Sequence, residues 1–281
     1  MFRSLGTGPL GVQVASLADG LDLAARPGFA GYHFGIGEVA ARGAGRAREL
    51  AEEKGVRLSG WGFPLDFRGA LTPYDEGLAQ LPELAAVAAE LGVLRTATWI
   101  MPASDELSYE ENFAFHVERL KPAAAILAAH GIRFGLEYVE PKTLWASKKH
   151  AFAHTMEQML ELCAAIGENM GLLLDSWHWY TSRETADDLR GLRAEQIVDV
   201  HVNDAPAGIG IDEQVDNVRD LPGATGVIDI GTFLGVLQEL GYDGPVMVEP
   251  FSERVRAMAD EEAVAVTADA LAAVWREAGL A

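Results

Sequence analysis

The sequence predicts a single α/β domain of the (β/α)8 barrel class, spanning residues 1–281. Eight short apolar runs, each with the length and composition of a buried parallel strand, alternate with eight longer helical patterns. No linker or low-complexity stretch divides the chain. Four consecutive runs in its second half end in an acidic or imidazole side chain. In a barrel of parallel strands, all such ends open onto the face that carries the chemistry.

The predicted strands and helices alternate as a closed barrel requires. Strands are predicted at residues 11–15, 31–34, 56–62, 95–101, 132–138, 170–175, 197–203 and 245–249. Helices are predicted at residues 17–25, 39–54, 73–91, 109–130, 151–166, 186–192, 230–240 and 261–277.

Several predicted helices carry signals at their ends. Thr72 precedes Pro73, which predicts a capping hydroxyl followed by proline at the first helical position. Ser108 and Glu111 have the spacing of a capping box. A glycine follows four of the helices at the place where a left-handed residue is needed: Gly55, Gly92, Gly131 and Gly241.

Two predicted connections at the C-terminal ends of the strands are longer than a bare barrel needs. They cover residues 62–72, after the third strand, and 204–227, after the seventh. Long ordered loops at this face form lids or substrate walls. Pro222, Gly223 and Gly226 indicate a shaped turn in the second loop, because proline fixes φ and glycine permits unusual angles.

The strongest functional signal is the set of polar residues that end the last four predicted strands. They are Glu137 in FGLEY, Asp175 in GLLLD, His201 in IVDVH and Glu249 in PVMVE. One such residue alone favours a solvated strand end or a helix cap. Four together, three of them carboxylates that would repel one another, favour a shared divalent cation. We therefore expect a metal site at the barrel mouth.

His178 lies just past the sixth strand, three residues after Asp175. It could bind substrate or shuttle a proton, and Trp177 could wall the pocket with the aromatic residues at positions 179 and 180. A cluster that only packs the barrel rim is the equal alternative.

Composition limits the partners. The net charge of -20 argues against nucleic acid, whose phosphates it would repel. Lys142 and Lys148 could hold a phosphorylated substrate, although a solvated loop face is the simpler interpretation. No apolar stretch approaches the roughly 20 residues that span a membrane. Cys163 is the only cysteine, so the chain cannot form an internal disulfide, and this suits a cytoplasmic location. We expect Cys163 to be a small core residue. We expect a small-molecule substrate, with a homo-oligomer left open.

The segments FGLEY, LLLDSWHWY, VHVNDAP and VMVEPF resemble the xylose-isomerase-like superfamily of TIM-barrel sugar isomerases and epimerases. That superfamily includes ketose 3-epimerases, inosose isomerases and inosose dehydratases. The loop VRDLPGATGVIDI is similar to the R-x-x-P-G-x-G-x-I-D stretch of 2-keto-myo-inositol isomerases, which makes Arg219 a candidate for substrate binding. Ketose epimerases carry an arginine six residues after the metal-binding histidine, where this chain has Ala207.

The resemblance implies one Mn, Mg, Co or Zn ion, held by Glu137, Asp175, His201 and Glu249. It also implies an enediolate mechanism on a keto-sugar or keto-inositol, in which the ion lowers the pKa of a substrate C–H. Glu137 and Glu249 would act as bases on opposite faces of the substrate, and His178 would contact a substrate oxygen.

Other functions remain open. A lyase, such as an inosose or 3-keto-sugar dehydratase, would use the same metal and the same proton abstraction before losing a β-leaving group. Apurinic endonucleases share the barrel, but they hold three metals and grip DNA, which the charge of -20 disfavours. A non-catalytic barrel that binds a sugar or a partner protein is disfavoured by the four intact ligand positions.

Overall fold

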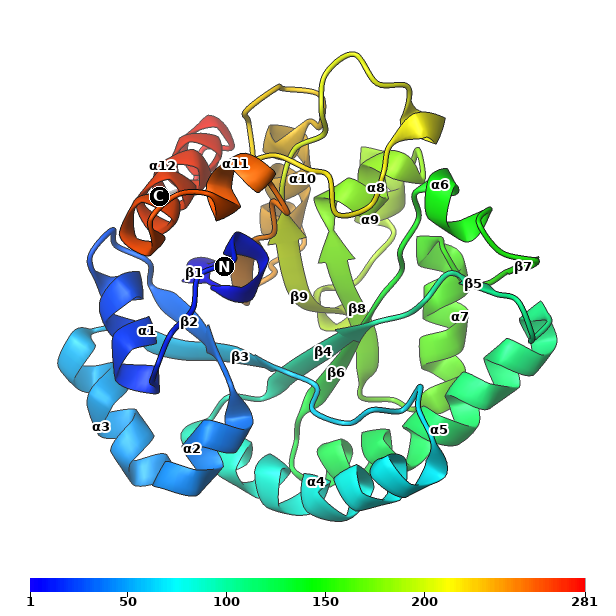
Figure 1. The fold of residues 1–281 in the computed structure, drawn as a ribbon, viewed down its shortest axis with the longest axis horizontal. Coiled ribbons are helices and arrows are strands. Elements are labelled where there is room, and N and C mark those ends of the chain that lie inside the picture. Colours follow the sequence, from blue (N-terminus) through cyan, green and yellow to red (C-terminus); the bar gives the residue numbers. More distant parts are fainter. Residues whose placement is uncertain (281) are drawn as a thin grey trace.

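Eight parallel strands close into a barrel in the computed structural model, which describes residues 1–280. Around the ring their order is β1, β10, β9, β8, β6, β4, β3, β2, with the helices packed outside (Figure 1). The predicted (β/α)8 barrel is confirmed. Within residues 1–280, no helix is both long enough and apolar enough to cross a membrane.

The strands and helices are numbered in chain order. The barrel strands are β1 (Phe2–Leu5), β2 (Gly31–Phe34), β3 (Arg57–Gly62), β4 (Arg95–Trp99), β6 (Arg133–Glu137), β8 (Met170–Asp175), β9 (Ile197–Val202) and β10 (Pro245–Val248). The helices are α1 (Leu17–Ala25), α2 (Ile36–Arg42), α3 (Ala44–Lys54), α4 (Leu71–Leu91), α5 (Tyr109–Ala129), α6 (Lys142–Trp145), α7 (Met156–Ile166), α8 (Ser176–Thr181), α9 (Ala186–Arg190), α10 (Ile230–Glu239), α11 (Glu253–Arg256) and α12 (Asp260–Glu277). Three 3-10 turns are η1 (Gly8–Leu10), η2 (Ala194–Gln196) and η3 (Ile211–Glu213).

The predicted first strand, at residues 11–15, is wrong. Strand β1 is Phe2–Leu5, which pairs with β10 on one side and β2 on the other. Gly11 has φ 77° and ends the turn η1. The residues after it, in which apolar and polar side chains alternate, therefore lie in a loop. A four-residue strand that begins with mixed polarity carries too little periodicity to be recognised, and only its two neighbours identify it.

Three helix predictions also need correction. The helix predicted at 39–54 is two helices, α2 and α3, because Gly43 between them has φ 90° and ψ 139°, outside the helical region. Helix α4 begins at Leu71 with Ala70 at its N-cap, so Thr72 does not cap it. The helix predicted at 151–166 begins at Met156, after a capping bond from the Gln158 amide to the Thr155 hydroxyl.

The other end signals are confirmed. The Glu111 amide donates to the Ser108 hydroxyl over 3.3 Å, and the Ser108 amide donates to the Glu111 carboxylate over 2.9 Å. The four glycines predicted to end helices all have positive φ: Gly55, Gly92, Gly131 and Gly241.

The loops at the barrel mouth form two groups. The loops that follow β4 and β6 are joined by a short antiparallel pair, β5 (Ala103–Ser104) with β7 (His150–Ala151). The loop that follows β9, residues 203–229, is the long yellow excursion in Figure 1, and its turn η3 lies against α6. Gly223 and Gly226 in that loop have φ values of 76° and 71°, as expected for a shaped turn. The mouth is therefore walled by ordered chain.

Candidate metal centre

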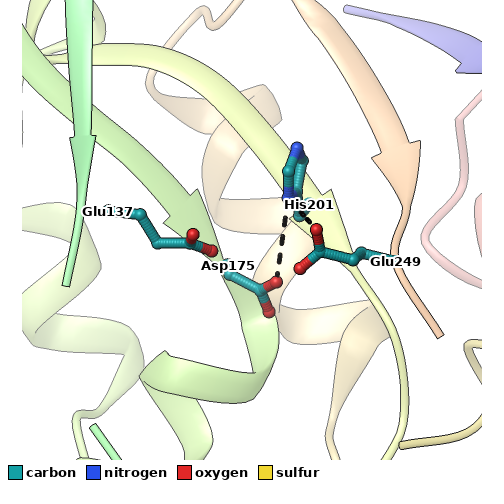
Figure 2. A group of neighbouring side chains, drawn as sticks. All are labelled: Glu137, Asp175, His201 and Glu249. Atoms are coloured by element: carbon teal, nitrogen blue, oxygen red, sulfur yellow. Dashed lines mark ion pairs between the residues drawn. The ribbon is translucent and has the colours of Figure 1, made fainter. Parts of the chain in front are cut away.

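The side chains that end the last four barrel strands converge at the mouth. Figure 2 shows Glu137, Asp175, His201 and Glu249 pointing toward one another from separate strands. Each offers one ligand atom, and these four atoms all lie within 4.8 Å of one another. Glu137, Asp175 and His201 are buried, and Glu249 is partly buried. The predicted convergence is present.

Strand register places these residues at one level. Asp175 on β8 lies beside His201 on β9, and His201 lies beside Met247 on β10. The Glu249 amide, one residue past β10, donates to the Val202 carbonyl over 3.0 Å. Because parallel strands in register end together, their last side chains reach the same space.

The residues fit a divalent cation, because two buried ligand atoms have no hydrogen-bond partner. Oε1 of Glu137 and Nδ1 of His201 are both buried and unpaired. His201 Nδ1 lies 3.5 Å from a Glu249 oxygen and 4.0 Å from an Asp175 oxygen, in ion-pair contact without hydrogen-bond geometry. A buried polar atom without a partner costs about 1–3 kcal/mol. Three carboxylates and one imidazole suit Mn²⁺, Zn²⁺ or a similar ion.

Burial and charge shift the pKa values of the cluster in different directions. Burial, followed by the nearby charge of Glu249, raises the pKa of Glu137 well above its usual value. Burial also pushes the pKa of Glu249 up, but His201 and Arg219 offset this and hold it below its usual value. Burial lowers the pKa of His201, yet Glu249 and Glu137 raise it to about 10. Protons and a divalent cation would therefore compete for these side chains.

Arg219 reaches this cluster from the loop 203–229. Its Nη1 donates to Asp175 over 2.9 Å and to Glu249 over 3.0 Å. Its Nη2 donates to Asp216 over 2.8 Å and lies 3.2 Å from Nε2 of His178. A buried guanidinium with this many charged partners is held in one orientation. The residue predicted from the loop motif therefore touches two of the four candidate ligand residues.

Two aromatic rings flank the Arg219 guanidinium. Its central carbon lies 5.2 Å from the ring centre of Trp177 and 5.0 Å from that of Phe251. Trp177 is fully buried and does not line the pocket described below, so the prediction that it walls the pocket needs correction. Trp177 lies inside α8, and its indole faces the Arg219 guanidinium.

His178 has a donor next to each ring nitrogen. The Glu140 amide donates to Nδ1 over 3.2 Å, while Arg219 Nη2 lies 3.2 Å from Nε2. Burial, and then the charge of Arg219, lowers the pKa of His178 to about 3, so the ring is neutral at pH 7. A neutral imidazole has only one acceptor nitrogen, so one of these two contacts stays unsatisfied. Glu137 Oε1 lies 3.7 Å from the same Nε2.

A pocket of about 470 Å³ opens above the cluster. Its floor includes Glu137, His178, Arg219 and Glu249. Its walls are mostly apolar. They are formed by Trp99, Met101, Val139, Thr143, Leu144, Val215, Asp216, Asn217 and Phe251. A larger, more open groove of about 1020 Å³ lies between α7 and α9 and contains none of the four ligand residues. Chemistry therefore identifies the smaller pocket as the site.

Several of the wall residues were not predicted from the sequence. Trp99 ends β4 beside Glu137 and could have been found by the rule that identified the ligands. Asn217 and Phe251 have positive φ values of 62° and 38°, which is uncommon for residues other than glycine. Such backbone strain is concentrated at functional sites, but no sequence signal marks it.

The two lysines considered for phosphate binding point elsewhere. Lys142 forms an ion pair with Asp212 over 3.2 Å, and Lys148 with Asp105 over 3.0 Å. Among the described residues, no lysine lines the pocket. Both side chains belong to the solvated loop face.

The family model described as xylose isomerase-like TIM barrel matches residues 21–274 of this chain. An inosose isomerase of Bacillus velezensis is 25% identical over 205 residues, which are 72% of this chain and 69% of that protein. A 3-dehydroshikimate dehydratase of Pseudomonas aeruginosa is 30% identical over 146 residues, 51% of this chain but only 22% of that protein.

Two solved structures resemble the whole barrel. A xylose isomerase domain protein from Alicyclobacillus acidocaldarius superposes with a TM-score of 0.87 at 29% identity, covering 99% of both chains. The IolI protein, whose crystal structure contains a zinc atom, superposes with a TM-score of 0.77 at 19% identity, covering 97% of both chains. The second likeness concerns the fold alone.

Proposed function

Because the chain belongs to the xylose isomerase-like TIM barrel family, we propose that it isomerises or epimerises a small polyhydroxy ketone, a ketose or a keto-inositol. The reaction would be a proton transfer through an enediolate of the substrate. The observation that carries the proposal is the convergence of three carboxylates and an imidazole beneath a pocket of substrate size. The curated inosose isomerase relatives support the same class of reaction.

Glu137, Asp175, His201 and Glu249 would hold one divalent ion. When bound, the ion would polarise the substrate carbonyl and a neighbouring hydroxyl and so lower the pKa of the C–H between them. Its identity among Mn, Mg, Co and Zn, a cytoplasmic location and a homo-oligomer remain predictions.

In this proposal the two glutamates exchange protons with a substrate from different sides. Glu137 ends β6 and Glu249 follows β10, with β8 and β9 between them, and both line the pocket. His178 lies between Glu137 and Arg219 and needs an acceptor for whichever ring nitrogen carries its proton. A substrate oxygen near Nε2 would supply that acceptor. Arg219 would bind a second substrate oxygen.

The charges around the pocket favour an uncharged, unphosphorylated substrate. Among the described residues 1–280, Arg219 is the one lysine or arginine that lines the pocket. Its guanidinium is already surrounded by the carboxylates of Asp175, Glu249 and Asp216. Even with a divalent ion bound, the four nearby carboxylates leave no surplus positive charge for a phosphate. The apolar wall around Trp99 and Phe251 suits the C–H face of a compact ring or short chain.

A lyase on the same site is the second candidate, and the dehydratase relative supports it. Its first step would be the same proton abstraction, after which a β-hydroxyl or aglycone would leave. The dehydratase match covers 22% of that protein, so it bears on the barrel rather than on the whole enzyme.

Deuterium incorporation tests the proposal. We expect protein loaded with Mn²⁺ to introduce deuterium from D₂O at the carbon beside the carbonyl of 2-keto-myo-inositol or a ketose, followed by NMR. Metal-stripped protein should do so only after Mn²⁺ is restored. With the same substrate in H₂O, an isobaric product supports an isomerase, and a product lighter by water supports the lyase. Metal-dependent exchange confined to phosphorylated ketoses would contradict the substrate charge proposed here.

A further inference from the structure

Asp204 binds four backbone amides of the loop that carries Arg219. Its carboxylate is fully buried, two residues past the end of β9. Oδ1 accepts from the amides of Ala205 (2.8 Å) and Ile228 (3.0 Å). Oδ2 accepts from the amides of Thr225 (2.8 Å) and Gly226 (2.7 Å). Three of these donors lie more than 20 residues further along the chain, so one side chain closes the loop.

The backbone of Asp204 fixes the loop next to Arg219. The Asp204 amide donates to the Asp220 carbonyl over 2.9 Å, and the Asp220 amide donates back over 2.8 Å. Arg219 is the residue immediately before this antiparallel bridge. The Thr225 hydroxyl adds a bond to the Ala205 carbonyl over 2.7 Å. The backbone of Asp204 is therefore bonded to the residue that follows Arg219.

The Asp204 carboxylate meets these four donors with two acceptor oxygens. Both of its oxygens are acceptors, whereas an asparagine would direct an NH₂ group at one of the two amide pairs. The other half of the loop is held independently, by bonds from Gln214 to the carbonyls of Pro206 and Ile209 and from Thr143 to the Gln214 carbonyl. The bonds of Asp204 are instead to Ala205 and to residues 220–228, which follow Arg219 directly.

We propose that Asp204 is a positioning residue that holds the Arg219 guanidinium against Asp175 and Glu249. The proposal rests on the proposed role of Arg219 at the substrate site. The Arg219 contacts are short and directional, so a displacement of about 1 Å would break them. Loss of Asp204 should consequently reproduce loss of Arg219, without removing a group that touches substrate.

Manganese affinity measures this positioning without requiring turnover. In the Arg219→Ala variant, a positive charge beside Asp175 and Glu249 is gone, so Mn²⁺ should bind more tightly, roughly tenfold or more. Asp204→Asn should shift the Mn²⁺ affinity in the same direction, roughly threefold or more. Asp204→Asn added to Arg219→Ala should change nothing further, because the positioned group is absent. A residue with a merely structural role would have the same effect in both backgrounds.

Asp220→Asn is the matched control, since this carboxylate lies in the same loop but bonds only the Leu221 amide and exposed Arg254. It should leave the Mn²⁺ affinity unchanged. Thr225→Val removes the hydrogen bond from the Thr225 hydroxyl to the Ala205 carbonyl. It should shift the Mn²⁺ affinity in the same direction as Asp204→Asn but by less, and it replaces that variant as the test if Asp204→Asn does not fold. Unchanged affinity in folded Asp204→Asn or in Thr225→Val, with a shift in Arg219→Ala, overturns the proposal.

Exchange of 2-keto-myo-inositol with D₂O, measured on the same variants, separates this inference from the proposed function. If wild-type protein exchanges no substrate proton while the affinity cycle holds, the proposed function fails and the positioning role stands. If wild-type protein is active and Arg219→Ala lowers kcat/KM, Asp204→Asn should lower it in the wild-type background only. Equal losses in both backgrounds would contradict positioning through Arg219.

Discussion

Arg219 places a positive charge beside two of the candidate metal ligands. Its guanidinium contacts Asp175 and Glu249, two of the three carboxylates whose repulsion would otherwise open the cluster. Asp175 is further held by the Trp177 amide at 2.6 Å and the Asn203 side chain at 2.9 Å. These contacts fix the orientation of Asp175 and Glu249, while the positive charge of Arg219 opposes the binding of a cation beside them.

Replacing the glutamates by glutamine separates metal binding from proton transfer. Glu137→Gln and Glu249→Gln keep an oxygen ligand, so part of the metal should remain bound. Each variant should lose roughly 10²–10⁴-fold in rate if the removed group acts as a base. If the two serve opposite faces of the substrate, one variant should still exchange the substrate C–H with D₂O yet form no epimer, and the other should not exchange it.

The exposed Glu239→Gln variant provides the control for that experiment, because Glu239 pairs with Arg190 on the barrel exterior. Both active-site variants retaining nearly full activity at saturating Mn²⁺ would show that the glutamates are ligands only. His178 would then be the leading candidate for the base.

At the residue scale, the sequence identified groups whose position follows from strand ends. Glu137, Asp175 and His201 converge because each lies at or near the end of a barrel strand, and the alternation of apolar runs locates those ends. The side-chain direction of Trp177 and the left-handed backbone of Phe251 depend on packing between distant segments. Periodicity carries no information about either.

Helix α5 buries a histidine that should make stability fall in acid. His116 stacks on Phe152 with ring centres 5.0 Å apart, and its Nδ1 lies 2.8 Å from the Asn112 carbonyl oxygen. Burial, only partly offset by the Asn112 hydrogen bond, lowers its pKa from 6.5 to about 4. The unfolded chain therefore takes up a proton near pH 6.5, before the folded protein does. The contribution of neutral His116 to the free energy of unfolding is complete above pH 6.5 and is lost as the pH falls toward 4.

Urea unfolding at pH 7 and pH 4.5 measures this effect. Between these values, wild-type protein should lose about 2.5 kcal/mol more unfolding free energy than His116→Phe, which keeps an aromatic ring but cannot titrate. The difference between the two proteins cancels the titration of the shared carboxylates. Equal losses in both would mean that His116 is protonated equally in the folded and unfolded states.

At the element scale, long periodic segments were predictable and short ones were not. Strand β8 matches its predicted bounds because all six of its residues are buried, which produces a continuous apolar run. Strand β1 has four residues, two of them only partly buried, and it is defined by its pairing with β10 and β2. Gly43 divides α2 from α3 through its backbone angles, although the helical pattern continues across it.

For the whole molecule, a bound cation should stabilise the fold by mass action. Because the four proposed ligands come from four different strands, only the closed barrel brings them together. At a hundredfold excess over Kd, binding contributes about 2.7 kcal/mol. Thermal unfolding with EDTA and then with excess Mn²⁺ should therefore differ in Tm by roughly 5–10 °C.

Asp175→Ala should fold but lose this dependence on Mn²⁺, since Asp175 lies at the mouth rather than in the packed layers of the barrel. An exposed control, Asp187→Asn on α9, should retain it. An unchanged Mn²⁺ effect in Asp175→Ala would remove Asp175 from the ligand set.

The pairing of β1 with β10 also determines how the ring can assemble. Residues Phe2–Ser4 align with Pro245–Met247, so the last seam joins segments about 240 positions apart. Closing so long a loop costs entropy that local contacts do not repay, which makes this seam a late event. A ribosome releases β1 well before its partner exists, and until then the sheet has two open edges, at β1 and at the newest strand. We expect nascent or refolding chains to pass through an unclosed, aggregation-prone sheet whose lifetime depends on the arrival of β10.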